Sequence, residues 1–330
     1  MEAIERVRAA LAMGPVDRPP AAWWGHAFRE EWSPAELAGV TVERHRRFGW
    51  DFVKLQPRAT CFAEAFGSAY RPSPREDTAP VLERPAVVEP EDWGRIGSTG
   101  ADAPTLADQT TALRQVAGEL GRVVPVVQTV FSPLTVAGYL VGEDRRRAVA
   151  ELRARPAEVG AALAAIAATM AEFAVRSVEA GAAGIFYAVS DYASSDLLTR
   201  REYEDLVLPH DRAVLAAVPD EAWFTVLHLC GANLHFDVAR ELPVQAVSWS
   251  VHDAGNPSLA EGRDRTGRAA MGGVDRVGAL VEGTRETVQA QVRDAIDETG
   301  ARGLLVAPGC SVPPEAPDEN LLALMRAAHH

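Results

Sequence analysis

The 330-residue sequence contains few cysteines and almost no lysine. Cys61, Cys230 and Cys310 are its only cysteines, and Lys54 is its only lysine. An odd, small number of cysteines argues against a disulfide framework, so metal binding or catalysis becomes the main alternative to simple packing. Arginine provides nearly all of the basic charge, which a GC-rich genome explains more simply than a binding function does.

Basic clusters, leader segments and long apolar runs are also missing from the sequence. Lys and Arg total 33 against 46 Asp and Glu, giving a net charge of −13 with no basic stretch to offset it. This acidic balance argues against nucleic acid as a partner. Residues 1–11 carry charges throughout, unlike a signal peptide, and no run of about 18 uncharged apolar residues follows. We therefore expect a cytoplasmic protein without a membrane-spanning segment.

The chain has the patterning of an α/β protein. Apolar residues make up 47% and charged residues 24%, an ordinary globular balance. Eight short apolar runs alternate with segments in which apolar residues recur every three to four positions. The runs are Ala21–Ala27, Asp51–Pro57, Val123–Val130, Ala183–Ser190, Trp223–Cys230, Ala246–Val251, Ala269–Asp275 and Gly303–Cys310. Apolar strands joined by helices indicate a parallel sheet, and eight units favour a (β/α)8 TIM barrel over an open doubly wound sheet.

Nucleotide-binding signatures are absent, because no GxGxxG or GxxxxGK[ST] motif follows any of the runs. A Rossmann-type fold is therefore disfavoured, and one barrel domain over residues 1–330 is expected. The irregular span 58–122 is too long for a simple strand-to-helix loop and is rich in proline and turn residues. We expect it to be a loop excursion with a small hairpin near one rim of the barrel.

Functional side chains in such barrels lie at the carboxyl ends of the strands. His228 and Cys230 stand two apart at the end of the fifth run, so a strand would point both to the same side. Cys310 ends the eighth run in a loop stiffened by a glycine and two prolines. Because barrel strands converge on one mouth, the three side chains could share an ion. Two thiolates and an imidazole favour zinc, and three protein ligands would leave one position open for substrate.

A structural role is the alternative for each of these residues. Both cysteines could be small buried hydrophobes, and His228 could be a core histidine with satisfied hydrogen bonds. An HxC pattern with one distant cysteine is less specific than paired CxxC motifs, so the spacing alone leaves both interpretations open. Cys61 lies in the irregular span without a polar neighbour and is expected to pack in the core.

An open zinc site with two thiolates suits one kind of reaction. Bound thiolates make the ion a modest Lewis acid, better at ionising an incoming thiol than at hydrolysing an amide. A free thiol with a pKa of about 8.5 is little ionised at pH 7. Such a site would therefore prepare a nucleophile for an activated methyl group.

Several segments together resemble the uroporphyrinogen decarboxylase superfamily over nearly the whole chain. They are GPVDRPP near the start, SPLTVAGYL after the third run, TRREYEDLVLPH after the fourth, HLCGAN, MGGVD, and LLVAPGCSVPPEAPDEN at the end. The HxC pattern followed by a late PGC resembles the branch of zinc-dependent cobalamin methyltransferases of the methylcobamide:coenzyme M type. The resemblance implies a TIM barrel in which His228, Cys230 and Cys310 hold zinc, and in which a zinc-activated thiol takes a methyl group from a corrinoid.

The sequence departs from true uroporphyrinogen decarboxylases at two strands. Those enzymes carry an arginine-rich RQAGR on the first strand, which holds substrate carboxylates, and an SDI-like aspartate at the end of the second. Here the corresponding stretches read WWGHAFRE and VKLQPRA, so Arg29 and Arg58 remain as candidate carboxylate clamps. Decarboxylation of a tetrapyrrole is therefore the alternative function. A non-catalytic zinc-binding module, with a closed four-ligand site, is the second alternative.

Further polar residues at the strand ends complete the expected site. Asp191 is expected to take part in catalysis beside the three ligands. The residues expected to contact substrate or orient His228 are His26, Gln128, Tyr187, His252 and Asp253, although each could equally be a loop or barrel-layer residue. No DxHxxG-type cobalamin motif occurs, so the donor would be free methylcobalamin or a separate corrinoid protein, and the acceptor a small thiol. The resemblance implies a homodimer.

Overall fold

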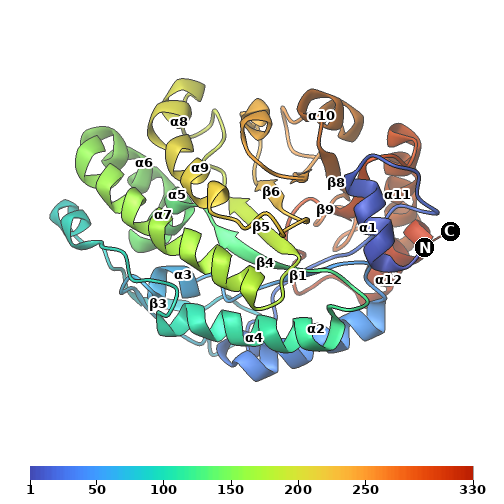
Figure 1. The fold of residues 1–330 in the computed structure, drawn as a ribbon, viewed down its shortest axis with the longest axis horizontal. Helices are drawn as coiled ribbons and strands as arrows, with labels where there is room; N and C mark the ends of the chain where they lie inside the picture. Colours follow the sequence, from blue (N-terminus) through green and yellow to red (C-terminus); the bar gives the residue numbers. More distant parts are fainter. Residues whose placement is uncertain (330) are drawn as a thin grey trace.

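The computed structural model describes residues 1–329 and shows a curled parallel sheet surrounded by helices (Figure 1). Its seven strands are hydrogen-bonded in the order β1-β4-β5-β6-β7-β8-β9, and every pair is parallel. The strands are β1 Val53–Leu55, β4 Val126–Phe131, β5 Gly184–Val189, β6 Val226–Leu229, β7 Ala246–Ser248, β8 Ala269–Val274 and β9 Leu304–Pro308. The predicted α/β TIM-barrel fold is confirmed.

The first predicted run closes the barrel without forming a regular strand. Ala21 and Gly25 make isolated parallel bridges to Val306 and Val312, on the β9 side. On the other side, the Asp51 amide donates a hydrogen bond to the Ala21 carbonyl at 2.9 Å, just before β1. This closing segment therefore lies between the two edge strands, where an eighth strand would stand. A Cβ at Gly25 would lie 2.7 Å from the Val312 carbonyl oxygen, so the close approach requires glycine.

Helices cover the outside of the sheet, as crossover connections require. They are α1 Ala3–Leu11, α2 Pro34–Phe48, α3 Cys61–Glu64, α4 Pro104–Leu120, α5 Pro133–Leu140, α6 Arg145–Ala154, α7 Pro156–Glu179, α8 Arg200–Leu206, α9 Leu208–Ala216, α10 Leu259–Thr266, α11 Arg285–Thr299 and α12 Asp318–His329. Short 3₁₀ segments are η1 Glu30–Trp32, η2 Pro90–Arg95 and η3 Phe236–Glu241. Several helices start at a capping side chain, such as Ser132 before α5 and Asp144 before α6, which accepts a backbone hydrogen bond three residues on.

The span 58–122 contains both an excursion and a regular part of the barrel. β2 Ala69–Arg71 and β3 Val81–Arg84 form a two-stranded antiparallel sheet separate from the main one. The last part of the span is α4, which packs against α2 and leads into β4. The prolines that make the sequence look irregular therefore lie no later than Pro104, the first residue of α4, and this helix is the crossover between β1 and β4.

α7 is the one helix within residues 1–329 that is long and apolar enough, by length and composition alone, to cross a membrane. Half of its apolar window is buried inside the protein. The helix packs against α5, α6, α9 and the neighbouring strands in the barrel wall. This packing accounts for its apolar composition.

Strand register assigns the side chains to the two faces of the sheet. Residues that pair in register share a face, and neighbours along a strand alternate. The face that carries His228 also carries Lys54, Thr129, Phe186 and Ser248. This is the face that lines the barrel interior, because the opposite face meets the surrounding helices.

Candidate metal centre

His228, Cys230 and Cys310 lie together at the carboxyl ends of β6 and β9. Each offers one donor atom such that all three atoms lie within 4.8 Å of one another. The two sulfurs are 3.7 Å apart, and neither cysteine forms a disulfide. His228 is buried while both cysteines are partly exposed, so the cluster lies just below the surface of the barrel mouth.

Two glycines let the backbone bring these ligands together. Gly231 follows Cys230 with a φ of +97°, and a Cβ there would lie 2.5 Å from Asp191 Oδ1. Gly309 precedes Cys310, and a Cβ there would lie 2.6 Å from the Cβ of Ser250. The chain therefore turns sharply beside the end of β5, and the loop that carries Cys310 passes close to the end of β7.

The two cysteines differ in their readiness to ionise. A hydrogen bond from the Cys230 thiol, together with the closeness of the His228 ring, holds the pKa of Cys310 below that of a free thiol. The same sulfur–sulfur contact, together with burial, raises the pKa of Cys230. The metal-free protein therefore favours a thiolate on Cys310 and a thiol on Cys230. A thiolate is the form of cysteine that binds metal ions.

The His228 ring is held by Ser248. Its Nδ1 lies 3.2 Å from Ser248 Oγ, and the two residues are register neighbours on β6 and β7. An Nδ1–H that donates to this hydroxyl leaves Nε2 free for a metal. His252 and Asp253, which we expected to orient the ring, are both exposed, and His252 Nε2 lies 3.2 Å from the Gly273 carbonyl instead. Sequence reasoning missed Ser248 because only strand register identifies it as the neighbour of His228.

Two residues expected to contact substrate, Gln128 and Tyr187, lie on the outer face of the sheet. Tyr187 precedes Ala188, which pairs with His228, so alternation puts Tyr187 on the face opposite His228. Its hydroxyl donates a hydrogen bond of 2.6 Å to Asp211 on α9. The register of β4 against β5 places Gln128 on the same outer face. The structure therefore does not bring either side chain to the cluster, and this part of the expected site is corrected.

His26 lies one side chain away from the ligand loop. Its Nδ1 is 2.8 Å from Glu31 Oε1, and its Nε2 is 3.0 Å from Gln56 Nε2. Gln56 Oε1 accepts a hydrogen bond of 3.4 Å from Ser311, the residue after Cys310. Gln56 thus links His26 to the loop that carries the third ligand.

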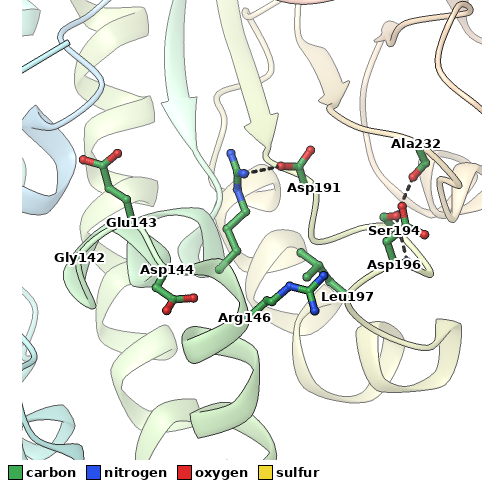
Figure 2. A pocket seen from close by; sticks show the side chains of 10 residues that line it. Gly142, Glu143, Asp144, Arg146, Asp191, Ser194, Asp196, Leu197 and Ala232 are labelled. Atoms are coloured by element: carbon green, nitrogen blue, oxygen red, sulfur yellow. Dashed lines mark hydrogen bonds and ion pairs between the residues drawn. The ribbon is translucent and has the colours of Figure 1, made fainter.

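Asp191 follows β5 and borders a cavity of about 540 Å³ (Figure 2). Its carboxylate pairs with the Arg145 guanidinium at 2.9 Å. The loop 142–146 before and into α6 and the segment 191–197 after β5 supply most of the walls. A smaller cavity of about 150 Å³ also includes Arg145 and reaches Ser190. Asp191 also lies against Gly231, the residue after the ligand Cys230, so the wall of the larger cavity is next to the loop that follows this ligand.

Arg29, Arg58 and Cys61 lie outside the cluster. Arg58 is buried and committed to other partners, since it donates to both carboxylate oxygens of Glu64 at 2.9 Å and to the Glu31 carbonyl at 3.0 Å. Arg29 is mostly exposed and pairs with a surface glutamate. Neither guanidinium is placed to hold a substrate carboxylate at the mouth. Cys61 is fully buried in the core, where burial raises the pKa of its thiol.

The chain is similar to known proteins over nearly its whole length. A family model described as uroporphyrinogen decarboxylase (URO-D) matches residues 3–330. The methylcobamide:CoM methyltransferase MtbA of Methanosarcina mazei is 26% identical, covering 98% of this chain and 96% of that protein. Its counterpart from Methanosarcina acetivorans is 24% identical with the same coverage. A solved methyltransferase structure from Methanosarcina mazei shares the fold, with a TM-score of 0.82 at 21% identity, covering 100% of this chain and 98% of that one.

Proposed function

The chain belongs to the uroporphyrinogen decarboxylase family, and from this premise we propose that it transfers a methyl or other small alkyl group between a corrinoid and a thiol. A zinc ion held by His228, Cys230 and Cys310 would activate the thiol. The curated relatives that match nearly the whole chain are named as methylcobamide:CoM methyltransferases, which supports the corrinoid and the methyl group.

The spacing of the donor atoms carries the proposal. Two sulfurs that each lie about 2.3 Å from zinc at a tetrahedral angle are about 3.8 Å apart. Cys230 and Cys310 hold their sulfurs 3.7 Å apart, with a ring nitrogen of His228 within 4.8 Å of both. Thiolate and imidazole donors favour zinc over magnesium or calcium, which prefer oxygen. The residues present therefore fit a tetrahedral zinc site with one position left for substrate.

The residues around the proposed site have separable roles. Bound zinc would supply the Lewis acidity that lowers the pKa of an incoming thiol, so that a thiolate is available near neutral pH. Ser248 holds His228 in the orientation that offers Nε2. Asp191, fixed by Arg145, borders the space through which a second reactant reaches the thiol, and we assign it to contact with the reacting molecules there.

The alkyl donor would be a separate molecule. The sequence has no DxHxxG-type motif for ligating cobalamin, so the corrinoid would come as free methylcobalamin or on a partner protein. The acceptor would be a small thiol. Three free cysteines fit a reducing, cytoplasmic environment, and a homodimer is the assembly that the family resemblance suggests.

A metal assay tests the ligand set. The purified protein is expected to bind about one equivalent of zinc, and Cys310→Ser is expected to lose it because one of three protein ligands is removed. Cys61→Ala is the matched control, since it removes the remaining cysteine from the core rather than from the cluster. Zinc retained by Cys310→Ser, or lost equally from Cys61→Ala, would contradict the assignment.

Methyl transfer is followed through the visible spectrum of methylcobalamin, which changes when the methyl group leaves. The change is expected only when zinc-loaded protein and a thiol are both present. Metal-free protein that decarboxylates a porphyrinogen would establish the alternative activity instead. An inert protein whose metal has four protein ligands would establish the non-catalytic module.

A further inference from the structure

Lys54, the only lysine of the chain, lies inside the barrel beside the ligand cluster. It is 7% exposed, and strand register places it on the inner face of β1. Its ammonium group faces Phe186, whose ring lies 5.2 Å from the ring of His228. It also donates a hydrogen bond to Gln56, which accepts another from Ser311, the residue after the third ligand. Two short series of contacts therefore join Lys54 to the cluster.

No group within residues 1–329 neutralises this buried charge by an ion pair. The one hydrogen bond of Lys54 goes to the neutral amide of Gln56, and the nearest ring centroids are those of Phe186 at 4.9 Å and Trp24 at 5.8 Å. Burial lowers the pKa of Lys54 to about 7, and the charges of Cys310 and, to a smaller extent, of the buried Glu31 oppose that shift without direct contact. Rings and an amide offset only part of the cost of burying a cation, so among the described residues the ammonium has no anionic partner in direct contact.

The charges of the proposed site explain which partner is missing. A neutral imidazole, two thiolates and a dication sum to zero, so the zinc-loaded site offers Lys54 no net negative charge. An acceptor that binds as a thiolate adds one negative charge, and an acidic group on the acceptor would add another. The acceptor is therefore the component of the reaction that can balance the buried ammonium.

We propose that Lys54 is the counter-cation for the negative charge of the acceptor thiol, and thus a specificity-determining residue of this site. The inference rests on the proposed function and deepens it, because it defines the acceptor class by charge as a small anionic thiol. The charge can come from the ionised sulfur or from an acidic group elsewhere on the molecule, and the two sources predict different substrate preferences.

Two thiols of similar size, 3-mercaptopropionate with an acidic group and 2-mercaptoethanol without one, show whether Lys54 balances an acidic group or the ionised sulfur. Lys54→Met keeps the length of the side chain and removes its charge. The kcat/KM for 3-mercaptopropionate is expected to fall between about 10- and 100-fold, because a charge-assisted contact is lost. If an acidic group is the partner, the kcat/KM for 2-mercaptoethanol is unchanged in Lys54→Met. If the sulfur is the partner, the kcat/KM falls by the same factor for both thiols. Unchanged kcat/KM for both thiols, at full zinc content, would overturn the proposal.

Gln56→Glu is a second variant that leaves Lys54 in place. A carboxylate at the present hydrogen-bond acceptor would give Lys54 a resident counter-ion, which the acceptor must then displace. The expected result is a higher KM for the acceptor thiol with zinc content unchanged. If Lys54 had a purely structural role, the new ion pair would make the protein more stable and leave the KM unaltered, and this result would count against the proposal.

The single lysine also permits a direct measurement on the unmutated protein. Labelling with ¹⁵N-lysine gives one side-chain signal, from Lys54, without assignment. In zinc-loaded protein without any corrinoid, this signal is expected to shift when 3-mercaptopropionate binds and to stay in place with propanol. A signal that stays in place, while the visible spectrum of cobalt-substituted protein reports thiol binding, would overturn the proposal.

This measurement separates the failure of one proposal from that of the other. A shifted Lys54 signal without any methyl transfer from methylcobalamin would count against the proposed function alone. Methyl transfer with an unshifted signal would count against the role of Lys54 alone.

Discussion

At the scale of single residues, the candidate centre depends on how its donor atoms are oriented. Cys230 and Cys310 contact each other directly, and their approach is set by the backbone through two glycines. His228 is different, because a ring on a strand can rotate unless a neighbour holds it. Ser248 is that neighbour, at 3.2 Å from Nδ1. The geometry of the nitrogen donor therefore depends on a single hydroxyl group.

Ser248→Ala is expected to weaken zinc binding by about 10-fold or more, because partners that orient a ligating histidine typically contribute that much to metal affinity. Competition with a coloured chelator measures the change. Ser177→Ala is the matched control, since it removes another buried hydroxyl, one that donates to the Phe173 carbonyl within α7. Equal zinc affinity in Ser248→Ala and the unmutated protein would show that Ser248 does not orient the ring.

At the scale of secondary-structure elements, β5 serves both faces of the sheet. Its inner face carries Phe186 toward the cluster, while on its outer face Tyr187 donates a hydrogen bond to Asp211 of α9. Tyr203 of α8 donates to the other oxygen of the same carboxyl at 2.6 Å. One buried carboxyl therefore fastens two helices to the strand behind the candidate site.

The pH dependence of stability should reflect this carboxyl. Burial raises the pKa of Asp211 to about 6, although both tyrosine hydrogen bonds oppose the shift. Because the folded-state pKa lies above the unfolded value of about 3.9, folding favours the protonated form. The contribution of this carboxyl to the free energy of unfolding is therefore complete below about pH 4, and it is lost as the pH rises through about 6. At pH 8 the loss amounts to up to about 3 kcal/mol.

Asp211→Asn, which cannot ionise, should therefore gain stability relative to the unmutated protein as the pH rises from 4 to 8. Urea unfolding at the two pH values measures the difference. Asp205→Asn is the control, because that carboxyl is exposed on α8 and pairs with Arg201 at the surface. The prediction would be contradicted if Asp211→Asn and the unmutated protein differed in free energy of unfolding by the same amount at both pH values.

At the scale of the whole molecule, the barrel is closed by an irregular segment rather than by an eighth strand. Asp51, just before β1, stabilises this closure. Its carboxylate accepts hydrogen bonds from the Ala21 amide at 2.9 Å and from Arg6 and Arg18 at 2.7 and 2.6 Å. The side chain is 4% exposed. These contacts lie at the amino end of β1, whereas the ligand cluster lies at the carboxyl ends of the strands.

Asp51→Asn should destabilise the protein by about 3 kcal/mol or more, because two guanidinium groups lose a buried counter-ion. The zinc content of the folded protein should not change, since the cluster lies at the opposite end of the strands. Urea unfolding and metal analysis test the two parts. Glu119→Gln breaks an exposed pair with Arg46 and should cost at most about 1 kcal/mol. Equal costs for the two variants would show that the buried network does not stabilise the closure.

Particular residues show where sequence reasoning succeeded and where it stopped. Apolar runs located all seven strands of the parallel sheet, because a strand buried on both faces needs apolar residues throughout. The alternation of His228 and Cys230 was also readable, since it depends on one strand alone. Tyr187 was misplaced because a shift of one position moves a side chain to the other face, and the end of a run does not define that position.

The sequence by itself determined the fold class and the chemical character of the candidate centre. Periodicity, turn residues and the spacing of histidine and cysteine act over a few residues, so they can be read without coordinates. Only the tertiary structure decided which distant groups meet. Ser248 reaches His228 across 20 positions, and Ser311 reaches Gln56 across 255. Such contacts depend on the register between strands and on closure of the barrel, and no pattern of neighbouring residues in the sequence predicts either of them. The unpartnered charge of Lys54 became visible for the same reason, because burial is a property of the folded chain.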